Sequence, residues 1–141
     1  MMLLVSYAFE FVGTPYKWGG SGPEGIDCSG LVQEILMSVG MDPVGDQTAQ
    51  ALYEHYSMQA TASAKFGAGA LCFYGRTENN VSHVAFMIDG QRVIEAGGGG
   101  SKTLSRMDAE RDQAFVRVRP FNHRKDLVCV IMPDYPEWVK K

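Results

Sequence analysis

The stretch "IDCSG" at residues 26–30, followed by "LVQEILMSVG" at residues 31–40, decides how this chain is built. The second part repeats apolar residues at helical spacing and closes with a glycine, a residue that often ends helices. A glycine- and proline-rich loop at residues 13–27 comes before the helix. Cys28 therefore lies at a loop-to-helix junction, where the positive end of the helix would stabilise a thiolate. This position predicts a nucleophilic thiol rather than a buried apolar cysteine.

Length and composition favour one globular domain. The chain has 141 residues, of which 45% are hydrophobic and 21% are charged, and a chain of this size can bury a substantial core. Its net charge of −3 and its lack of a long basic run argue against nucleic acid as the main partner. The three cysteines fit neither a disulfide framework nor a zinc motif. We expect a single domain over residues 1–141 that needs no metal and no organic cofactor.

The first residues, "MMLLVSYAFEFVG" (1–13), are apolar but lack the basic start of a signal peptide. The run is too short to cross a bilayer, and Glu10 interrupts it. We expect an amphipathic helix over residues 2–12, synthesis in the cytoplasm without a signal peptide, and no stable insertion into a membrane.

Helical patterns fill the first part of the chain, and strand patterns follow them. Besides the first helix, we expect helices at residues 28–39 and 46–56, the latter with Asp46 as its N-cap. Helices followed by strands favour an α+β fold, with N-terminal helices packed against an antiparallel sheet of about five or six strands. The tail at residues 133–141 is expected to be loosely ordered. The strand patterns lie at residues 70–75, 82–89, 92–96, 114–121 and 127–132.

A cysteine nucleophile needs a base, and among the three histidines only His83 lies on a predicted strand. Alternation places His83 and Ala85 on one face of that strand, which the helix that begins at Cys28 could cover. His55 falls in a predicted helix and His123 in a polar loop. We expect both to be surface groups.

The dipeptide Asp-Gly at residues 89–90 predicts a hairpin that returns the strand at 92–96 alongside the His83 strand. In this register His83 faces about Ala96, and Glu95 is one position away from direct pairing. A bulge at the turn could correct the offset, so Glu95 is a candidate to orient the imidazole. Each of these residues, taken alone, is more often structural than catalytic.

Together these residues resemble the NlpC-type family of peptidoglycan peptidases, which are papain-like cysteine peptidases. In that family Pro-Tyr and Gly-Gly precede Asp-Cys-Ser-Gly, and a His-Val strand follows. The resemblance covers roughly residues 2–120. It departs at Ala70, where the family usually has an acid, and at Glu95, where the family commonly has histidine. The blocks that carry it are "GTPYKWGG" (13–20), "IDCSGLV" (26–32), "SHVAFMIDG" (82–90) and "VIEA" (93–96).

The resemblance implies a papain-like, NlpC-type fold and a set of roles. Cys28 would be the nucleophile, His83 the base and Glu95 the third polar residue, which orients the imidazole. The backbone N–H of Cys28 would serve the oxyanion. Oxyanion binding or substrate positioning would fall to Tyr16, Asp27 and Ser29. The substrate cleft would be lined by Trp18, Gly19, Gly20, Ser21, Gly97 and Gly98.

The resemblance also implies the substrate, which is the peptidoglycan stem peptide. The cut would fall between D-Glu (or D-isoGln) and a diamino acid, through a thioester acyl-enzyme. We expect a monomer that reaches the cell wall by delivery, with a holin, another delivery system or phage tail proteins as partners. Two alternatives stay open. One is a non-catalytic cell-wall-binding or phage tail module of the same fold, and the other is an amidase or acyltransferase acting on another small amide.

Overall fold

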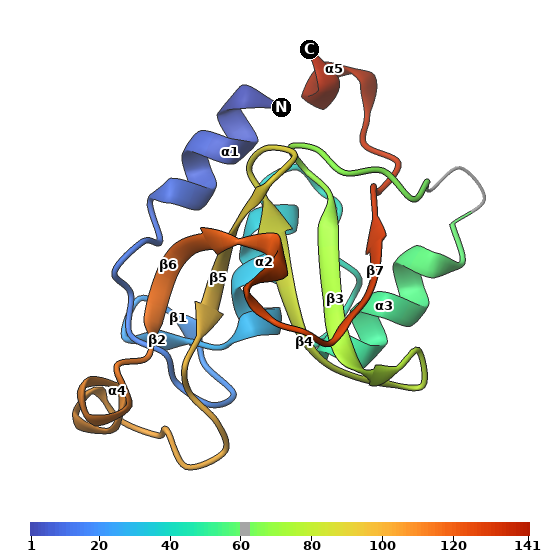
Figure 1. Ribbon diagram of the computed structural model, residues 1–141. Helices are drawn as coiled ribbons and strands as arrows, with labels where there is room; N and C mark the ends of the chain where they lie inside the picture. Colours follow the sequence, from blue (N-terminus) through green and yellow to red (C-terminus); the bar gives the residue numbers. More distant parts are fainter. Residues whose placement is uncertain (60–62) are drawn as a thin grey trace.

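The computed structural model describes residues 1–59 and 63–141 and shows an α+β fold (Figure 1). The larger helices are α1 (Met2–Phe9), α2 (Cys28–Met37) and α3 (Ala49–Ser57). The main strands are β3 (Leu71–Thr77), β4 (Asn80–Met87), β5 (Arg92–Gly97), β6 (Phe115–Pro120) and β7 (Leu127–Ile131). The short elements are β1 (Ser21–Gly22), β2 (Gly25–Ile26), α4 (Arg106–Asp112), the 3-10 turn η1 (Phe121–His123) and α5 (Glu137–Lys140). The predicted fold class is confirmed.

The five main strands form one antiparallel sheet in the order β6-β5-β4-β3-β7. Two strands that are consecutive in the sequence, β6 and β7, therefore lie at opposite edges of the sheet. Residues 121–126 join them by running across one face, in front of the sheet in Figure 1. We call this segment the crossing link. The helices α2 and α3 contact the sheet through β4, and α2 lies behind the sheet in the same view.

Alternation along the strands divides the buried side chains between two clusters, one on each face of the sheet. The helix side is the larger, and there Val84 and Phe86 of β4 belong to the same cluster as Leu31 of α2. On the opposite face, Phe121 and Leu127, at either end of the crossing link, pack against the smaller cluster. Besides Ala70 and Val130, that smaller cluster contains Cys72, Tyr74, Ala85, Met87 and Val93.

The helices are shorter than predicted. The first, α1, ends at Phe9 rather than at residue 12, and α2 ends at Met37 rather than at residue 39. Gly40 follows α2 with a φ of 72°, a left-handed conformation that glycine adopts without strain. The glycine therefore belongs to the turn after the helix, and the apolar repeat that precedes it continues beyond the last helical residue.

The start of α3 was predicted wrongly. The helix begins at Ala49, and its N-cap is Thr48, whose Oγ1 accepts a hydrogen bond from the Ala51 N–H at 3.1 Å. Asp46 lies two residues earlier, too far from the first free N–H groups of the helix to cap it. Both side chains are good cap residues, so composition alone did not distinguish them.

Two ordered segments near the C-terminus were missed. The prediction of a loosely ordered tail is wrong, because Tyr135 and Val139 are buried and the Tyr135 hydroxyl donates to the Gly69 carbonyl at 2.7 Å. The helix α4 begins after Ser105, whose hydroxyl accepts from the Asp108 N–H at 3.1 Å. The sequence "SRMD" at residues 105–108 is an N-cap pattern that could have revealed this helix.

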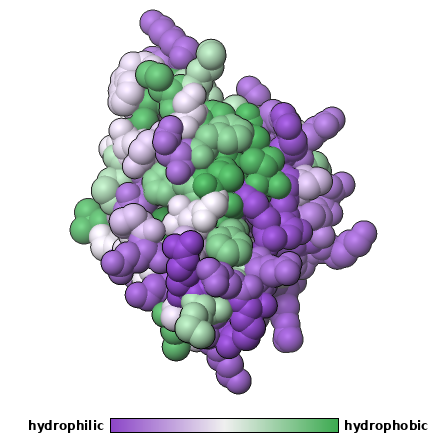
Figure 2. Space-filling view, turned by 90° about the vertical axis from the view of Figure 1, so that its left-hand side faces the viewer, coloured by the Kyte–Doolittle hydropathy of each residue, from purple (hydrophilic) through white to green (hydrophobic). Residues whose placement is uncertain are grey.

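The first helix has apolar residues on both sides, which differs from the predicted amphipathic pattern. Leu4 and Ala8 are buried against the rest of the protein. Figure 2 views the molecule from the side of α1, and apolar residues gather in its upper half. The exposed large apolar side chains of α1 and the turn after it are Met2, Leu3, Tyr7, Phe9 and Val12.

No helix within residues 1–59 and 63–141 has the length and apolar character needed to cross a bilayer.

Candidate active site

The thiol of Cys28 lies at the first residue of α2, and Asp27 caps this helix. The Asp27 Oδ1 accepts a hydrogen bond from the Gly30 N–H at 2.7 Å. The N–H groups of Cys28 and Ser29 have no carbonyl partner inside the helix, because the first turn of any helix lacks one. The half-buried thiol is therefore surrounded by backbone donors and by the positive end of the helix.

Asp27 also holds the preceding loop against the start of α2. Its Oδ2 accepts from the Gly19 N–H at 3.1 Å, and its own N–H donates to the Gly20 carbonyl at 3.0 Å. A Cβ at Gly30 would lie 2.5 Å from the Gly20 oxygen, so this close approach of loop and helix requires glycine. Ser29 is buried, and its hydroxyl donates to Asp27 at 3.3 Å. Asp27 and Ser29 thus organise the backbone that carries the thiol.

The register between β4 and β5 brings Glu95 to the face of His83. Phe86 pairs with Ile94. This register is offset by one residue from the predicted one, in which His83 lay opposite about Ala96. A shift by one residue turns a side chain to the other face of a sheet. Glu95 therefore lies diagonally from His83 on the same face, and no bulge at the turn is needed to bring the two together.

His83 and Glu95 form a buried pair. The imidazole Nε2 lies 2.9 Å from the Glu95 Oε1. This contact leaves the Nδ1 of His83 for the thiol of Cys28. Burial on its own lowers the pKa of His83, but the hydrogen bonds to the Cys28 thiol and the Glu95 carboxylate outweigh it and raise that pKa to about 9. The three side chains form a thiol–imidazole–carboxylate chain suited to nucleophilic catalysis.

The helix reaches His83 from the side opposite to the predicted one. We expected α2 to cover the face that holds His83 and Ala85, but α2 packs on the face that holds Val84 and Phe86. It contacts both β4 and β5, and the pairing between those strands stops short of His83. Cys28 meets the imidazole where the two strands separate. The face with Ala85 is covered by the crossing link instead.

The crossing link carries a second histidine to Glu95, which the sequence did not reveal. His123 Nε2 lies 3.0 Å from the Glu95 Oε2. The prediction that His123 is a surface group is wrong, because its side chain is only 16% exposed. No motif marks this residue, and its position depends on the long-range path of the link. His55 is exposed on α3, as predicted.

Tyr16 is buried beside the thiol. Its N–H donates to the Ala114 carbonyl at 2.9 Å, and its ring packs so closely against Gly99 that any Cβ there would overlap it. Burial, together with the charges of Cys28 and Asp27, raises the pKa of the Tyr16 phenol well above its ordinary value. The hydroxyl therefore keeps its proton and can donate a hydrogen bond beside the thiol.

The model of the NlpC/P60 family matches residues 13–119, which include Tyr16, Cys28, His83 and Glu95. The chain belongs to the NlpC/P60 family. Its resemblance to NlpC-type peptidases is thus confirmed at the level of the family.

Curated relatives resemble this NlpC/P60 chain over about two thirds of its length. The probable peptidoglycan endopeptidase LytE of Bacillus subtilis (strain 168) is 38% identical over 105 residues, which are 72% of this chain and 29% of LytE. Protein P54 of Enterococcus faecium is 33% identical over 98 residues, which are 66% of this chain and 17% of P54. The chain therefore spans less than a third of the length of these relatives.

A solved NlpC/P60 domain has the same fold. The crystal structure of the NlpC/p60 domain of the peptidoglycan hydrolase SagA is similar with a TM-score of 0.66 and 25% identity. The match covers 91% of this chain and 94% of the SagA domain. The peptidoglycan hydrolase RipB of Mycobacterium tuberculosis gives a TM-score of 0.67 at 22% identity, over 96% of this chain and 66% of RipB, and shows the fold alone.

A groove of about 410 Å³ lies beside Cys28 in this NlpC/P60 domain. Its lining combines residues that the sequence indicated with residues 46–49 and 81–82. Trp18 is 52% exposed, so its ring offers a flat apolar surface at the groove. The groove residues that the sequence indicated are Tyr16, Trp18, Gly19, Asp27, Cys28 and Ser29.

The remaining predicted cleft residues do not line this groove. Gly20 and Ser21 border a separate hollow of about 330 Å³. Gly97 is buried, and a Cβ there would lie 2.8 Å from the Glu95 Oε2. A Cβ at Gly98 would lie 2.5 Å from the Arg117 guanidinium. Gly97 and Gly98 therefore make room for the side chains around Glu95 rather than for a ligand.

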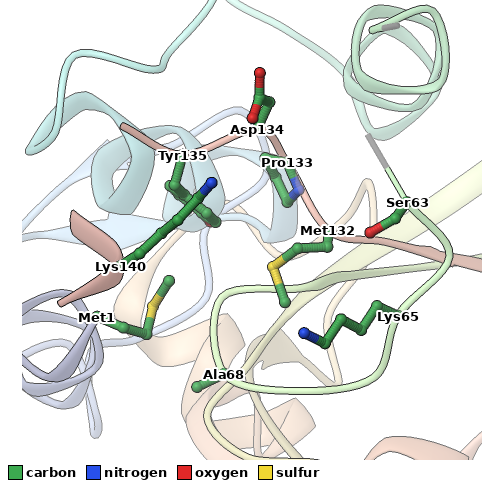
Figure 3. Close-up of a pocket in the computed structure, with 9 residues that line it drawn as sticks. All are labelled: Met1, Ser63, Lys65, Ala68, Met132, Pro133, Asp134, Tyr135 and Lys140. Carbon is green, nitrogen blue, oxygen red and sulfur yellow. The ribbon is translucent and has the colours of Figure 1, made fainter. Parts of the chain in front are cut away.

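Another cavity of the NlpC/P60 domain, of about 390 Å³, lies away from the thiol (Figure 3). Lys65 and Lys140 border it, and Asp134 lies at its rim. Its lining includes none of the residues that the sequence indicated. The groove beside Cys28 is therefore the better candidate for the substrate cleft, because it places a thiol in its lining.

Proposed function

We propose that this chain is a cysteine endopeptidase that hydrolyses peptidoglycan stem peptides. The observation that carries the proposal is the half-buried Cys28 at a helix start, in contact with a buried His83 that is paired with Glu95 at 2.9 Å. Membership of the NlpC/P60 family supports the reaction class. LytE and SagA, whose names refer to a peptidoglycan endopeptidase and a peptidoglycan hydrolase, support the substrate class.

In the proposed mechanism, His83 takes the proton of Cys28, and the resulting thiolate attacks the carbonyl carbon of the scissile amide. The carbonyl oxygen becomes an oxyanion, which the Cys28 N–H and the Tyr16 hydroxyl stabilise. The C–N bond then breaks, His83 protonates the leaving amine, and a thioester remains on Cys28. A water molecule, deprotonated by His83, hydrolyses the thioester and releases the carboxylate product.

We propose that the cut falls between D-Glu (or D-isoGln) and a diamino acid. A stem peptide is an extended chain with few bulky groups, and the groove beside Cys28 offers an open path for it. The exposed ring of Trp18 at one wall supplies apolar contact area for the peptide stem. Of the three residues from Cys28 to Glu95, Cys28 lines this groove and so can reach a bound peptide.

A digest of purified peptidoglycan tests this proposal. Diaminopimelate-type and lysine-type walls are incubated with the protein, and the soluble fragments are identified by mass spectrometry. Fragments that end in D-Glu or D-isoGln are expected with the native chain and not with Cys28→Ala. If neither wall yields fragments while simple γ-glutamyl amides are hydrolysed, the substrate class is wrong and an amidase remains.

The pH dependence of activity is expected to change when Glu95 is replaced by glutamine. The raised pKa of His83 keeps the imidazole charged until the pH rises through about 9, so the native kcat/KM should fall above that pH. Glutamine removes the negative charge that supports imidazolium, while burial continues to disfavour it. The alkaline limb of Glu95→Gln should therefore move down by about 2 pH units, as measured by kcat/KM from about pH 5 to pH 10. An unchanged alkaline limb would remove Glu95 from the proposed mechanism.

A further inference from the structure

His123 makes two polar contacts, one through each ring nitrogen. Its Nε2 lies 3.0 Å from the Glu95 Oε2, and its Nδ1 lies 2.9 Å from the Pro120 carbonyl oxygen. A carbonyl oxygen and an ionised carboxylate can only accept hydrogen bonds. The Nδ1 of His123 therefore donates to Pro120, and its Nε2 lies within ion-pair distance of the carboxylate, so that a proton on this nitrogen places a positive charge beside Glu95. Glu95 is thus held between two imidazole rings, one on each carboxylate oxygen.

We propose that His123 is a positioning residue that keeps the Glu95 carboxylate ionised and aimed at His83 throughout turnover. This inference rests on the proposed peptidase function. His123 is not among the residues that line the groove beside Cys28, and we infer that it acts through its contact with Glu95.

The need for a second cation follows from the burial of Glu95, which is 2% exposed. Burial raises the pKa of Glu95, and its partners His83, His123 and Arg119 together hold it below the usual value. During turnover His83 gives its proton to the leaving amine and becomes neutral. A buried carboxylate whose cationic partner has become neutral tends to take up a proton, and a protonated Glu95 no longer supports the imidazolium. His123 keeps one positive charge beside the carboxylate at that moment.

Arg119 is a second cation that forms an ion pair with Glu95, but its geometry is weaker than that of His123. Its Nε lies 3.9 Å from the Glu95 Oε2, beyond hydrogen-bond distance, and its side chain is 37% exposed. Solvent therefore screens its charge more than that of His123. Of the two cations, His123 makes the shorter and better shielded contact.

The crossing link is fastened so that His123 stays in place. The Tyr74 hydroxyl donates to the Phe121 carbonyl at 2.6 Å, and the Phe121 N–H donates to the Gln91 carbonyl at 2.9 Å. At the far end of the link, the Gly75 N–H donates to the Asp126 carbonyl at 2.9 Å. His123 lies beyond residues 13–119, which the family model matches.

Other titratable groups border this pair. The Tyr74 ring lies between the two histidines, with centroids 5.5 Å from His83 and 6.2 Å from His123. The Arg124 guanidinium lies over the Tyr74 ring at 5.4 Å and pairs with Asp126 at 2.8 Å. Further titratable groups are coupled electrostatically to Glu95 or to His83. They are Cys28, Cys72, Tyr74, Arg117, Arg119, Arg124 and Asp126.

The test measures how fast iodoacetamide alkylates Cys28 as a function of pH, with peptide mass spectrometry to separate it from the other two cysteines. The variants are His123→Ala, His123→Gln and His123→Lys, with the exposed His55→Ala as a matched control. At about pH 5.5, His123→Ala is expected to react about tenfold more slowly than the native chain, because Glu95 then binds a proton. At about pH 8 the difference should be less than about twofold. His123→Lys should restore the native profile, and His123→Gln should not.

The outcomes separate this inference from the proposed function. If Cys28 reacts no faster than Cys129 in the native chain, the proposed function fails. If Cys28 is reactive but its profile is the same in His123→Ala, the inference about His123 is overturned. A full return to the native profile in His123→Gln would also overturn it, since glutamine donates a hydrogen bond without a charge. Thermal melting of each variant checks folding, and the lysine–glutamine comparison decides the matter if the alanine variant does not fold.

Discussion

Replacing Cys28 with serine is expected to lower the turnover of peptidoglycan by about 10⁴-fold or more, with almost no change in thermal melting. Serine nearly matches cysteine in size, so the helix start capped by Asp27 should remain intact. A hydroxyl is a much weaker acid than a thiol, so the His83–Glu95 pair would deprotonate only a very small fraction of it at neutral pH. The measurement is the initial rate of release of soluble fragments from purified cell wall.

The matched control for this change is Cys129→Ser. Cys129 lies on β7, is partly buried, and belongs to the helix-side core rather than to the groove. Burial raises the pKa of its thiol, so it stays protonated and unreactive. Turnover by Cys129→Ser should stay within about twofold of the native value. Comparable losses in both variants would show that the effect comes from folding and not from the nucleophile.

The second large effect is expected at His83. Replacing it with glutamine should lower turnover by about 10³- to 10⁴-fold, because the amide cannot take a proton from Cys28 or return one to the leaving amine. The alkylation rate of Cys28 near neutral pH should fall with it, since the thiolate loses the imidazolium that stabilises it. Both rates are measured on the same preparation, which shows whether one cause accounts for both losses.

His55→Gln is the matched control, since His55 is exposed and lies outside the site. It should leave both rates unchanged. The His83 variant should also lose roughly 2 kcal/mol of stability, because the buried Glu95 carboxylate loses a charged hydrogen-bond partner. If His83→Gln kept more than about a tenth of native turnover, a different base would have to serve Cys28.

The position of Cys28 at the start of a helix could be predicted from the sequence because its signals are local. A flexible loop, an acidic N-cap and an apolar helical repeat all lie within residues 13–40. The proposed base was located almost as directly, since His83 is the one histidine on a strand pattern. Glu95 required the hairpin register, and an error of one residue was enough to place it on the wrong face. The identity of a third residue therefore depends on turn geometry, which short motifs define poorly.

His123 could not be predicted in the same way. It lies 28 residues after Glu95 along the chain, and the two meet because β6 and β7 occupy opposite edges of the sheet. Strand order is a long-range property that neither propensity nor spacing specifies. The same limit explains the wrong face assigned to α2. Two sides of a buried sheet look alike in the sequence, and only the path of the crossing link distinguishes them.

The crossing link also has a consequence for when the protein becomes active. Because it joins opposite edges of the sheet, it can close over Glu95 only after β3, β4 and β5 have assembled between β6 and β7. Contacts between distant parts of a chain form late in folding, whereas a helix such as α2 forms early. A newly synthesised chain would carry its thiol on a finished helix well before the histidine pair around Glu95 is complete. We expect full reactivity of the thiol to appear together with the docking of β7. The docking of this last strand would then be the folding step at which the protein becomes active.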